Sequence, residues 1–189
     1  LNDCDSRVVR SCKLPIAVGS IPAHLETIDE LIMIGHGFFC IDVANGAHEN
    51  ALNTIKYIRE KCPEADIMSG NVATPDQARH CINAGANIIR VGIGGGSVCT
   101  TREVTGCGLP TLQSIIEIKA MINYPYTPEE LRTFKQDIIL VADGGIRNSG
   151  DIAKALVAGA DYVILGRLLA GSDESPGEIE EILDGTLPM

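Results

Sequence analysis

Residues 84–92 read AGANIIRVG, and residues 158–166 repeat the pattern as AGADYVILG. Each stretch has a small-residue helix end, a glycine, a short and mostly apolar run, and a second glycine. A glycine after the last helical residue is typical of a helix C-cap, and an apolar run without alternation is typical of a strand buried on both faces. Each stretch therefore predicts one helix-to-strand unit. Whether the two are a duplication of half-barrels or only show that βα units look alike stays open.

Outward from these stretches, β-branched runs alternate with amphipathic segments, which predicts repeated βα units around a parallel sheet. The expected strands are residues 14–18, 38–43, 66–69, 87–92, 138–142 and 162–165. Each leads into Gly, Asp or Asn, so the loops should lie at the carboxyl ends of the strands. The periodicity alone fits either an open doubly wound sheet or a (β/α)8 barrel of which two strands lie outside this sequence.

The helices between these strands are indicated by N-cap residues and by the spacing of apolar residues. Residues 74–77 (TPDQ) and 127–130 (TPEE) each place a hydroxyl at the N-cap, proline at the first helical position, and Gln or Glu where a capping box needs it. Leu52, Ile55 and Ile58 recur at three-residue spacing, which predicts a helix over residues 49–61 with one apolar face on the sheet.

The composition fits one domain of this class. Of the 189 residues 45% are apolar and only 4% aromatic, so the core must be built from Ile, Val, Leu and Ala, as in parallel α/β proteins. The formal charge of −10 argues against nucleic acid or an anionic membrane as a partner, because both require a basic surface. No run reaches the roughly 18 apolar residues of a membrane span.

The termini and the cysteines indicate a cellular context. The first residues have neither the basic nor the apolar region of a signal peptide, and the absence of an initial Met suggests that the sequence is not the whole gene product. The seven cysteines are odd in number, scattered, and form no C-x-x-C pair. They predict neither a disulfide framework nor a zinc site, and a reducing cytoplasm is expected.

The densest chemical signal is residues 90–102, RVGIGGGSVCTTR, in which a strand leads into glycines and then into Cys99 between hydroxyl residues. Glycines allow backbone N–H groups to approach a phosphate, or carbonyls to surround a cation, and the loop presents a nucleophile. Most free cysteines only fill space, so the motif by itself is compatible with an inert loop thiol.

Three other strand ends carry polar residues. They read IDVANGAH at 41–48, SGNV at 69–72 and VADGGI at 141–146. In parallel barrels the loops after the last strands commonly bind phosphate, and an acid before two glycines is placed to accept ribose hydroxyls. The residues alone leave a tight turn equally open for Asp143, and they favour structural capping for Asn71 and His48. Asp42 in an apolar strand needs a partner or a task.

Five motifs, in their order along the chain, resemble the IMP dehydrogenase and GMP reductase family. They are DVANG (42–46), GNVAT (70–74), VGIGGGSVCTTR (91–102), ADGGI (142–146) and LGRLLAGSDESPGE (165–178). The resemblance covers residues 13–178 and implies an α/β (β/α)8 TIM barrel, of which this sequence holds strands three to eight. Residues 1–189 would then form a single, incomplete catalytic barrel domain, with the first two strands and the C-terminal flap outside it.

The resemblance also implies site residues. Cys99 resembles the nucleophile that adds to purine C2, and Thr101 resembles the hydroxyl that handles the leaving ammonia or the attacking water. Asp143 resembles the ribose ligand. The expected phosphate ligands are Ser97, Gly144, Gly145 and Gly166, with Arg167 beside them; the expected cofactor-facing residues are Asp42, Asn71 and Arg90; and the carbonyls of Gly94, Gly96 and Cys99 resemble a potassium site.

Two reactions of the family remain open. A GMP reductase would use NADPH to convert GMP to IMP and ammonia through a Cys99 adduct, whereas an IMP dehydrogenase would oxidise IMP to XMP with NAD. DVANG, Val98, Thr105-Gly106 and Leu112 favour the reductase. A purine-nucleotide-binding barrel without catalysis is the third reading, and it depends on the flap, where the family keeps its second catalytic group.

Two departures from the family pattern stand out. Arg167 occupies a position where the family usually has Ser or Gly, and its guanidinium would either grip the phosphate or crowd it. Residues 121–136 are longer than the usual crossover, which predicts an extra helix outside the barrel. The resemblance further implies a cytoplasmic homotetramer.

Overall fold

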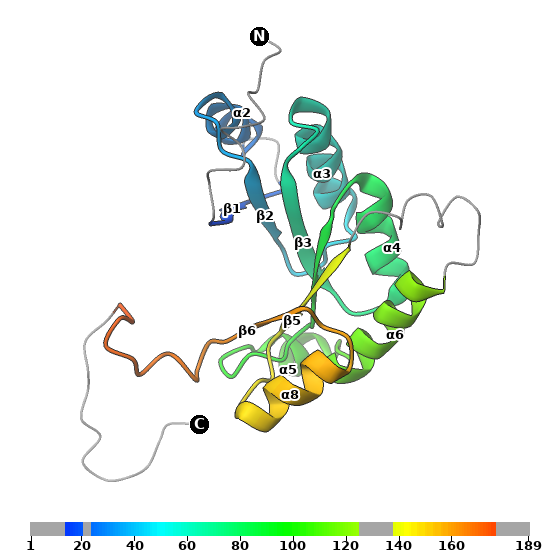
Figure 1. Ribbon diagram of the computed structural model, residues 1–189, viewed down its shortest axis with the longest axis vertical. Coiled ribbons are helices and arrows are strands. Elements are labelled where there is room, and N and C mark those ends of the chain that lie inside the picture. The colour runs from blue at the N-terminus through cyan, green and yellow to red at the C-terminus, as the bar shows by residue number, and fades with distance from the viewer. Residues whose placement is uncertain (1–13, 21–23, 125–137, 177–189) are drawn as a thin grey trace.

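The computed structural model describes residues 14–20, 24–124 and 138–176 as one curved sheet with helices along it (Figure 1). The strands are β1 (Ile16–Val18), β2 (Phe38–Asp42), β3 (Asp66–Val72), β4 (Ile88–Val91), β5 (Ile139–Asp143) and β6 (Tyr162–Ile164). The helices are α2 (Leu25–Met33), α3 (Glu49–Lys61), α4 (Pro75–Ala84), α5 (Thr101–Thr105), α6 (Thr111–Asn123) and α8 (Ser149–Val157).

The strand order decides between the two architectures that the sequence left open. The six strands lie in the order β1-β2-β3-β4-β5-β6, and every neighbouring pair is parallel. A doubly wound sheet reverses its strand order at a switch point, whereas a βα barrel adds each strand beside the last. The sheet is therefore a partial TIM barrel, as the family resemblance implied.

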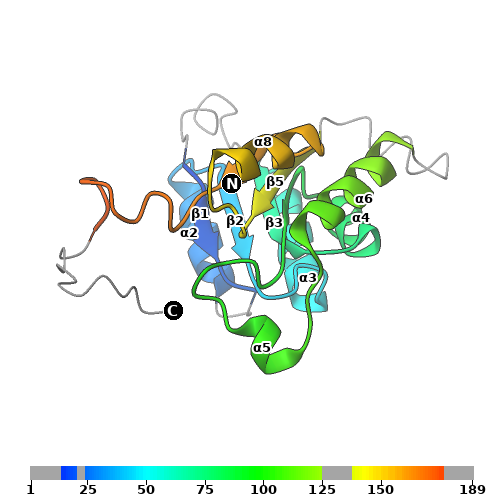
Figure 2. The same ribbon diagram turned by 90° about the horizontal axis from the view of Figure 1, so that it is seen from below.

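Helices α2, α3, α4, α6 and α8 form an arc along one side of this sheet, whereas the short α5 lies apart in the loop after β4 (Figures 1 and 2). Consecutive helices touch one another, α2 with α3, α3 with α4, α4 with α6, and α6 with α8. This single layer follows from right-handed crossovers between parallel neighbours, which place the crossover helices on the same face. The other face corresponds to the barrel interior.

The core lies between the sheet and this helical layer. Alternate strand residues point toward the helices and are fully buried, among them Phe39, Ile41, Ile67, Ile89 and Leu140. Helix α3 meets them with Ile55 and Ile58, as its three-residue spacing predicted. A strand pleat sends the next residues to the opposite face, so Asp42, Arg90 and Asp143 are directed into the barrel interior.

Most predicted boundaries agree with the structure to within two residues. The helix expected over 49–61 is α3, and α4 begins with a capping box in which the Thr74 side chain accepts from the Gln77 amide. The largest difference is in β3, which continues to Val72 rather than ending at residue 69. Asn71 therefore belongs to the strand. The helix expected after residue 127 lies outside the described residues.

Both AGA stretches behave as predicted. Gly85 ends α4 with a φ of 115°, and Gly159 follows α8 with a φ of 114°. These left-handed conformations strain any residue with a side chain, which explains glycine at both positions. The strands that follow, β4 and β6, are the two that the pattern predicted.

Candidate active site at the carboxyl edge of the sheet

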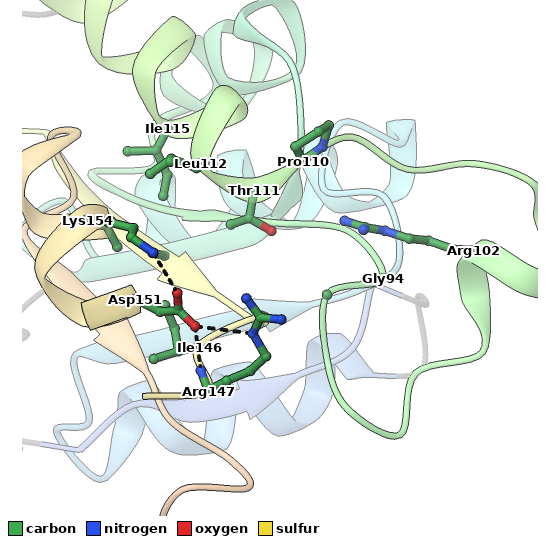
Figure 3. A pocket seen from close by; sticks show the side chains of 15 residues that line it. Gly94, Arg102, Pro110, Thr111, Leu112, Ile115, Ile146, Arg147, Asp151 and Lys154 are labelled. Carbon is green, nitrogen blue, oxygen red and sulfur yellow. Dashed lines mark hydrogen bonds and ion pairs between the residues drawn. The ribbon is translucent and has the colours of Figure 1, made fainter. Parts of the chain in front are cut away.

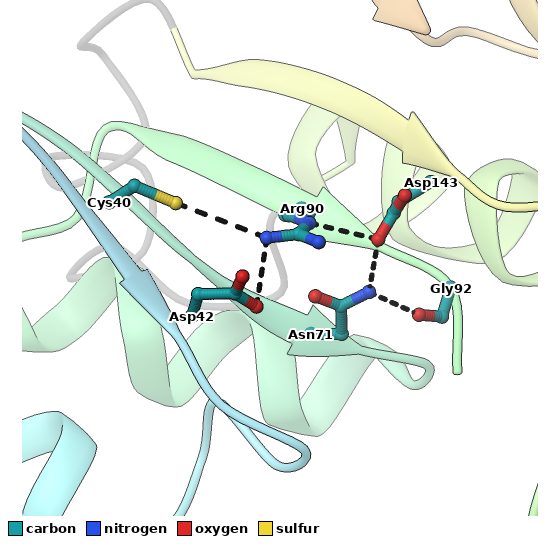
Figure 4. Close-up of polar contacts among 6 residues, drawn as sticks. All are labelled: Cys40, Asp42, Asn71, Arg90, Gly92 and Asp143. Atoms are coloured by element: carbon teal, nitrogen blue, oxygen red, sulfur yellow. Dashed lines mark hydrogen bonds and ion pairs between the residues drawn. The ribbon is translucent and has the colours of Figure 1, made fainter. Parts of the chain in front are cut away.

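The polar residues that follow the strands meet at one edge because all strands are parallel. Figure 4 shows Asp42 at the end of β2, Asn71 near the end of β3, Arg90 on β4 and Asp143 at the end of β5. The register explains the meeting: Asp42 is opposite Gly70, and Gly70 is opposite Arg90. Gly70 has no side chain, so the side chains of its two neighbours meet across β3.

Arg90 links two carboxylates from different strands. Its Nη1 lies 2.9 Å from Oδ1 of Asp42, and its Nε lies 2.9 Å from Oδ2 of Asp143 (Figure 4). Burial acts to lower the pKa of Arg90, but the carboxylates of Asp143 and Asp42 outweigh it, so the pKa is raised. The guanidinium is therefore a permanent cation, held between two acids that share one positive charge.

Asn71 completes this cluster. Its Nδ2 donates to Oδ2 of Asp143 at 2.7 Å and to the carbonyl oxygen of Gly92 at 2.5 Å. The peptide bond that joins Asn71 to Gly70 is cis. Because Asp143 Oδ2 accepts from both Asn71 and Arg90, the carboxylate is fixed in orientation. None of the described residues donates a hydrogen bond to its Oδ1.

Cys99 lies on the loop that follows β4. The thiol is exposed, and its Sγ lies 3.2 Å from the Thr101 hydroxyl. Hydrogen bonds from the Thr101 side chain and then from its backbone amide lower the pKa of Cys99, and the nearby Arg102 charge adds to this effect. Thiolate is the nucleophilic form of cysteine, so this setting favours the reactive form of Cys99.

The buried thiols contrast with Cys99. Burial raises the pKa of Cys40, and burial raises the pKa of Cys81 to about 11. Cys81 packs on the helix side of the sheet, where its Sγ donates to the carbonyl oxygen of Gly46 at 3.3 Å. Cys81 belongs to the core, whereas Cys40 lies on the barrel-interior face, where its Sγ is 4.0 Å from Nη1 of Arg90 (Figure 4). Of these three thiols only Cys99 has a lowered pKa.

The Cys99 loop is held in place by Arg102 and by close backbone packing. Nε of Arg102 donates to the carbonyl of Ile93 at 2.9 Å, and Nη2 donates to the carbonyl of Leu109 at 2.7 Å. A Cβ atom on Gly144 would lie 2.8 Å from the carbonyl carbon of Gly95. The loops after β4 and β5 thus touch through glycine backbones, which couples the positions of Cys99 and Asp143.

A protein-family model described as the IMP dehydrogenase / GMP reductase domain matches residues 7–186. The chain belongs to this family. The inosine-5'-monophosphate dehydrogenase of Chlorobaculum tepidum is 45% identical over 162 residues, which are 86% of this chain and 31% of that relative. The enzyme of the same name from Aquifex aeolicus is 41% identical over 177 residues, 94% of this chain and 34% of the relative.

Solved structures give the same family from the fold. The GMP reductase C318A of Trypanosoma brucei has a TM-score of 0.75 at 34% identity, over 89% of this chain and 36% of that chain. The same protein in complex with guanosine 5'-monophosphate has a TM-score of 0.76 at 34% identity, over 87% of this chain and 32% of the other. The chain thus spans about a third of the length of the relatives that it matches.

The phosphate ligands expected in a member of this family are only partly gathered. Gly144 and Gly145 lie beside the loop that carries Ser97, and both have left-handed φ angles near 80°. A Cβ on Gly166 would meet nothing within 4 Å, and Arg167 is exposed. Gly166 and Arg167 are therefore not packed against the other glycines among the described residues, and the phosphate site stays a prediction.

The expected cofactor and potassium residues of the family also stay predictions. Arg90 and Asn71 are directed to Asp143, whereas the Asp42 side chain is 50% exposed and retains an open oxygen for a ligand. Gly94, Gly96 and Cys99 lie on one turn, where the Cys99 amide donates to the Gly96 carbonyl at 3.2 Å. Backbone carbonyls are suitable donors for potassium, so the chemistry of this turn fits the ion.

Sequence reasoning missed two residues of this edge. Gly70 provides the space for the Arg90–Asp42 pair, and a glycine directly after the predicted strand 66–69 was the available signal. Arg102 fixes the Cys99 loop, but nothing in its sequence position indicated which carbonyls it would reach. Within the described residues, no group of His, Cys, Asp and Glu side chains could hold a metal ion, and no helix is long and apolar enough to cross a membrane.

Proposed function

We propose that the protein containing this chain is a purine-nucleotide oxidoreductase that forms a covalent bond between Cys99 and purine C2. The observation that carries the proposal is the exposed Cys99 thiol with its lowered pKa, on the loop that packs against the residues after Asp143. At one edge of a parallel barrel, a nucleophile can attack the base of a nucleoside monophosphate while a fixed carboxylate binds its ribose.

In this proposal each residue of the site has one task. The Asp143 carboxylate, oriented by Asn71 and Arg90, accepts ribose hydroxyls and so sets the position of the base. Thr101 stabilises the Cys99 thiolate and remains within hydrogen-bonding distance of a group that leaves or attacks at C2. Gly144 and Gly145 keep backbone N–H groups available near the phosphate. Because the chain has a net charge of −10, these oriented amides provide the local positive potential that an anionic substrate needs.

In the reductase direction, the Cys99 thiolate adds to C2 of GMP and the C2 amino group leaves as ammonia after it has gained a proton. NADPH, held on the side of Asp42, Asn71 and Arg90, would be the source of the hydride that C2 receives. The C2–S bond then breaks, which returns the Cys99 thiolate and gives IMP. One hydride and one proton enter for each ammonia released, so the step is balanced.

We favour the reductase because of DVANG at residues 42–46, together with Val98, Thr105-Gly106 and Leu112. A second candidate is the IMP dehydrogenase, in which hydride leaves C2 to NAD and water then releases XMP. A dehydrogenase at 45% identity and a reductase structure at 34% identity are both among the relatives, so the second direction is kept beside the first. Potassium, cytoplasmic location and a homotetramer belong to the proposal as family expectations.

The test is nicotinamide absorbance with the intact protein, offered GMP plus NADPH in one cuvette and IMP plus NAD in another. Consumption of NADPH with GMP alone supports the reductase, and formation of NADH with IMP alone replaces it by the dehydrogenase. The Cys99→Ala variant should be inactive in both. If wild-type protein binds the nucleotide but is silent in both cuvettes, the chain is a nucleotide-binding barrel without catalysis, and the proposal is wrong.

A further inference from the structure

Two exposed thiols lie on the segment between β4 and α6. Of the cysteines that the structure describes, only Cys99 and Cys107 are exposed. Cys99 comes directly before the N-cap of α5, and Cys107 comes directly after its C-cap. The purine chemistry proposed above uses Cys99 but gives Cys107 no task.

Helix α5 separates these two thiols. It has five residues, so it is about 7.5 Å long at the usual rise per residue. A disulfide requires Cα atoms about 4.4–6.8 Å apart. Sγ of Cys99 lies 3.2 Å from the Thr101 hydroxyl at one end, and Sγ of Cys107 lies 3.6 Å from the Thr105 carbonyl oxygen at the other. A bond between the two sulfurs therefore requires α5 to unwind.

Unwinding of α5 costs little packing. None of its residues is buried, and Val104 is 79% exposed. Figure 2 shows the helix lying apart from the sheet. Isolated helices shorter than about 12–15 residues are marginal in water, and α5 is much shorter. A Cβ atom on Gly106, the C-cap, would meet nothing within 4 Å, so the chain after α5 also has room to move.

Arg102 keeps the ends of this segment together. Figure 3 shows its side chain extending away from α5. Its Nε donates to the carbonyl of Ile93 at 2.9 Å, and its Nη2 donates to the carbonyl of Leu109 at 2.7 Å. One guanidinium thus binds the chain before the first thiol and after the second. Both thiols lie on one closed loop, and closure lowers the entropy that a bond within the loop costs.

We propose that Cys99 and Cys107 form a reversible disulfide when the protein meets hydrogen peroxide, and that this bond unwinds α5 and blocks the nucleophile. One thiol attacks peroxide, the O–O bond breaks, and a sulfenic acid and water form. The second thiol attacks that sulfur, the S–O bond breaks, and a second water leaves. The two thiols lose two electrons and two protons, which convert one peroxide into two waters. A dithiol returns both thiols by exchange.

The effect on activity rests on the proposed function, because Cys99 in a disulfide has no thiol that can add to purine C2. The disulfide itself depends only on the two thiols and on α5. A protein that forms the disulfide but is silent in both cuvettes would contradict the proposed function alone. An active enzyme that never forms the disulfide would contradict the switch alone.

Peptide mass spectrometry of the intact protein detects the disulfide directly. Trypsin cuts after Arg102, which places Cys99 on peptide 91–102 and Cys107 on peptide 103–119. Dilute protein is treated with hydrogen peroxide, then with iodoacetamide, and is digested without reduction. The two peptides should appear joined, the chain should stay monomeric on a denaturing, non-reducing gel, and dithiothreitol should separate the peptides. The proposal is overturned if Cys99 stays unlinked, bonds to another cysteine, or joins two chains.

Cys107→Ser tests the role of the second thiol. Without a partner, the Cys99 sulfenic acid is oxidised further to sulfinic acid, which dithiothreitol does not reduce. After peroxide and then dithiothreitol, the amount of Cys99 that iodoacetamide can label should be ~2-fold or more lower in this variant than in wild type. Equal recovery in the two proteins would overturn the role of Cys107.

A matched pair at Val104 tests the unwinding. This side chain is exposed, so Val104→Gly and Val104→Ala differ in helix propensity and not in packing. In a dithiothreitol redox buffer at equilibrium, the ratio of linked to unlinked protein should be ~3-fold or more higher in Val104→Gly than in Val104→Ala. Equal ratios would show that the disulfide forms without unwinding α5, and the switch would be wrong.

Discussion

Nε of Arg90 lies 2.9 Å from Oδ2 of Asp143, across 53 residues of sequence. The two side chains are only 18% and 16% exposed, so solvent screens the pair weakly. We expect Arg90→Met to lower the free energy of unfolding by about 2 kcal/mol, because it leaves two neighbouring acids without their cation. Urea denaturation measures this. Adding Asp42→Asn should recover part of the loss, and a purely additive double variant would contradict the shared charge.

The empty space at Gly70 leads to a second expectation. A Cβ atom there would lie 2.6 Å from Cβ of Arg90, so Gly70→Ala should displace Arg90 from Asp42 and cost about 2 kcal/mol of stability. Gly171→Ala is the control, since nothing lies within 4 Å of its added Cβ. Equal unfolding free energies for the two variants would show that the space at Gly70 is not needed.

The pKa of Cys99 can be read from its reaction with iodoacetamide. The alkylation rate should rise with pH and level off above an inflection that lies below the ordinary 9.0, because Thr101 favours the thiolate. Thr101→Val should move the inflection upward and slow alkylation at pH 7 by ~3-fold or more, whereas Thr101→Ser should not. Cys107, also exposed, lies on a different tryptic peptide and serves as the internal reference. An unchanged inflection in Thr101→Val would remove Thr101 from this role.

The contact between the glycine loops predicts unequal effects at adjacent positions. Gly144 and Gly145 have φ angles of 82° and 80°, so alanine at either position costs about 1–2 kcal/mol in backbone strain. Only at Gly144 would the new Cβ also collide with Gly95, whereas at Gly145 the nearest atom is 3.9 Å away. Gly144→Ala should therefore unfold at a lower urea concentration than Gly145→Ala, and it should alter the alkylation rate of Cys99. Equal stability of the two variants would contradict the packing.

The capping box of α4 is open to a double-mutant cycle. Thr74→Ala and Gln77→Ala should each lower stability by about 1 kcal/mol, and the double variant should lose less than the sum, because the two side chains cap one helix start together. Thr74→Ser is the conservative control and should keep most of the stability. Strict additivity would show that the two caps act independently.

The fold was predictable where local chemistry is sufficient. The caps at Thr74 and Gly85 and the spacing of Ile55 and Ile58 involve residues within one turn of each other, and the structure confirms them. The order of the strands in the sheet was not predictable from the spacing of apolar residues, because it depends on contacts between segments that are far apart in the sequence. There the family resemblance supplied the barrel, and the parallel sequential sheet confirmed it.

The sequence predicted which residues belong to the site, but not which of them pair with one another. Asp42, Asn71, Arg90 and Asp143 were all singled out, yet nothing in the sequence indicates that Arg90 pairs with both acids. Such pairing depends on register, and the register places Gly70 between two longer side chains.

Arg90 is the common counterion of Asp42 and Asp143. A ligand that donates a hydrogen bond to Oδ1 of Asp143 takes up part of the charge of this carboxylate, so the guanidinium then interacts relatively more strongly with Asp42. By thermodynamic linkage the effect is mutual, so a molecule bound at Asp42 changes the affinity at Asp143 by the same factor. Two ligands that never touch would thus communicate through one side chain.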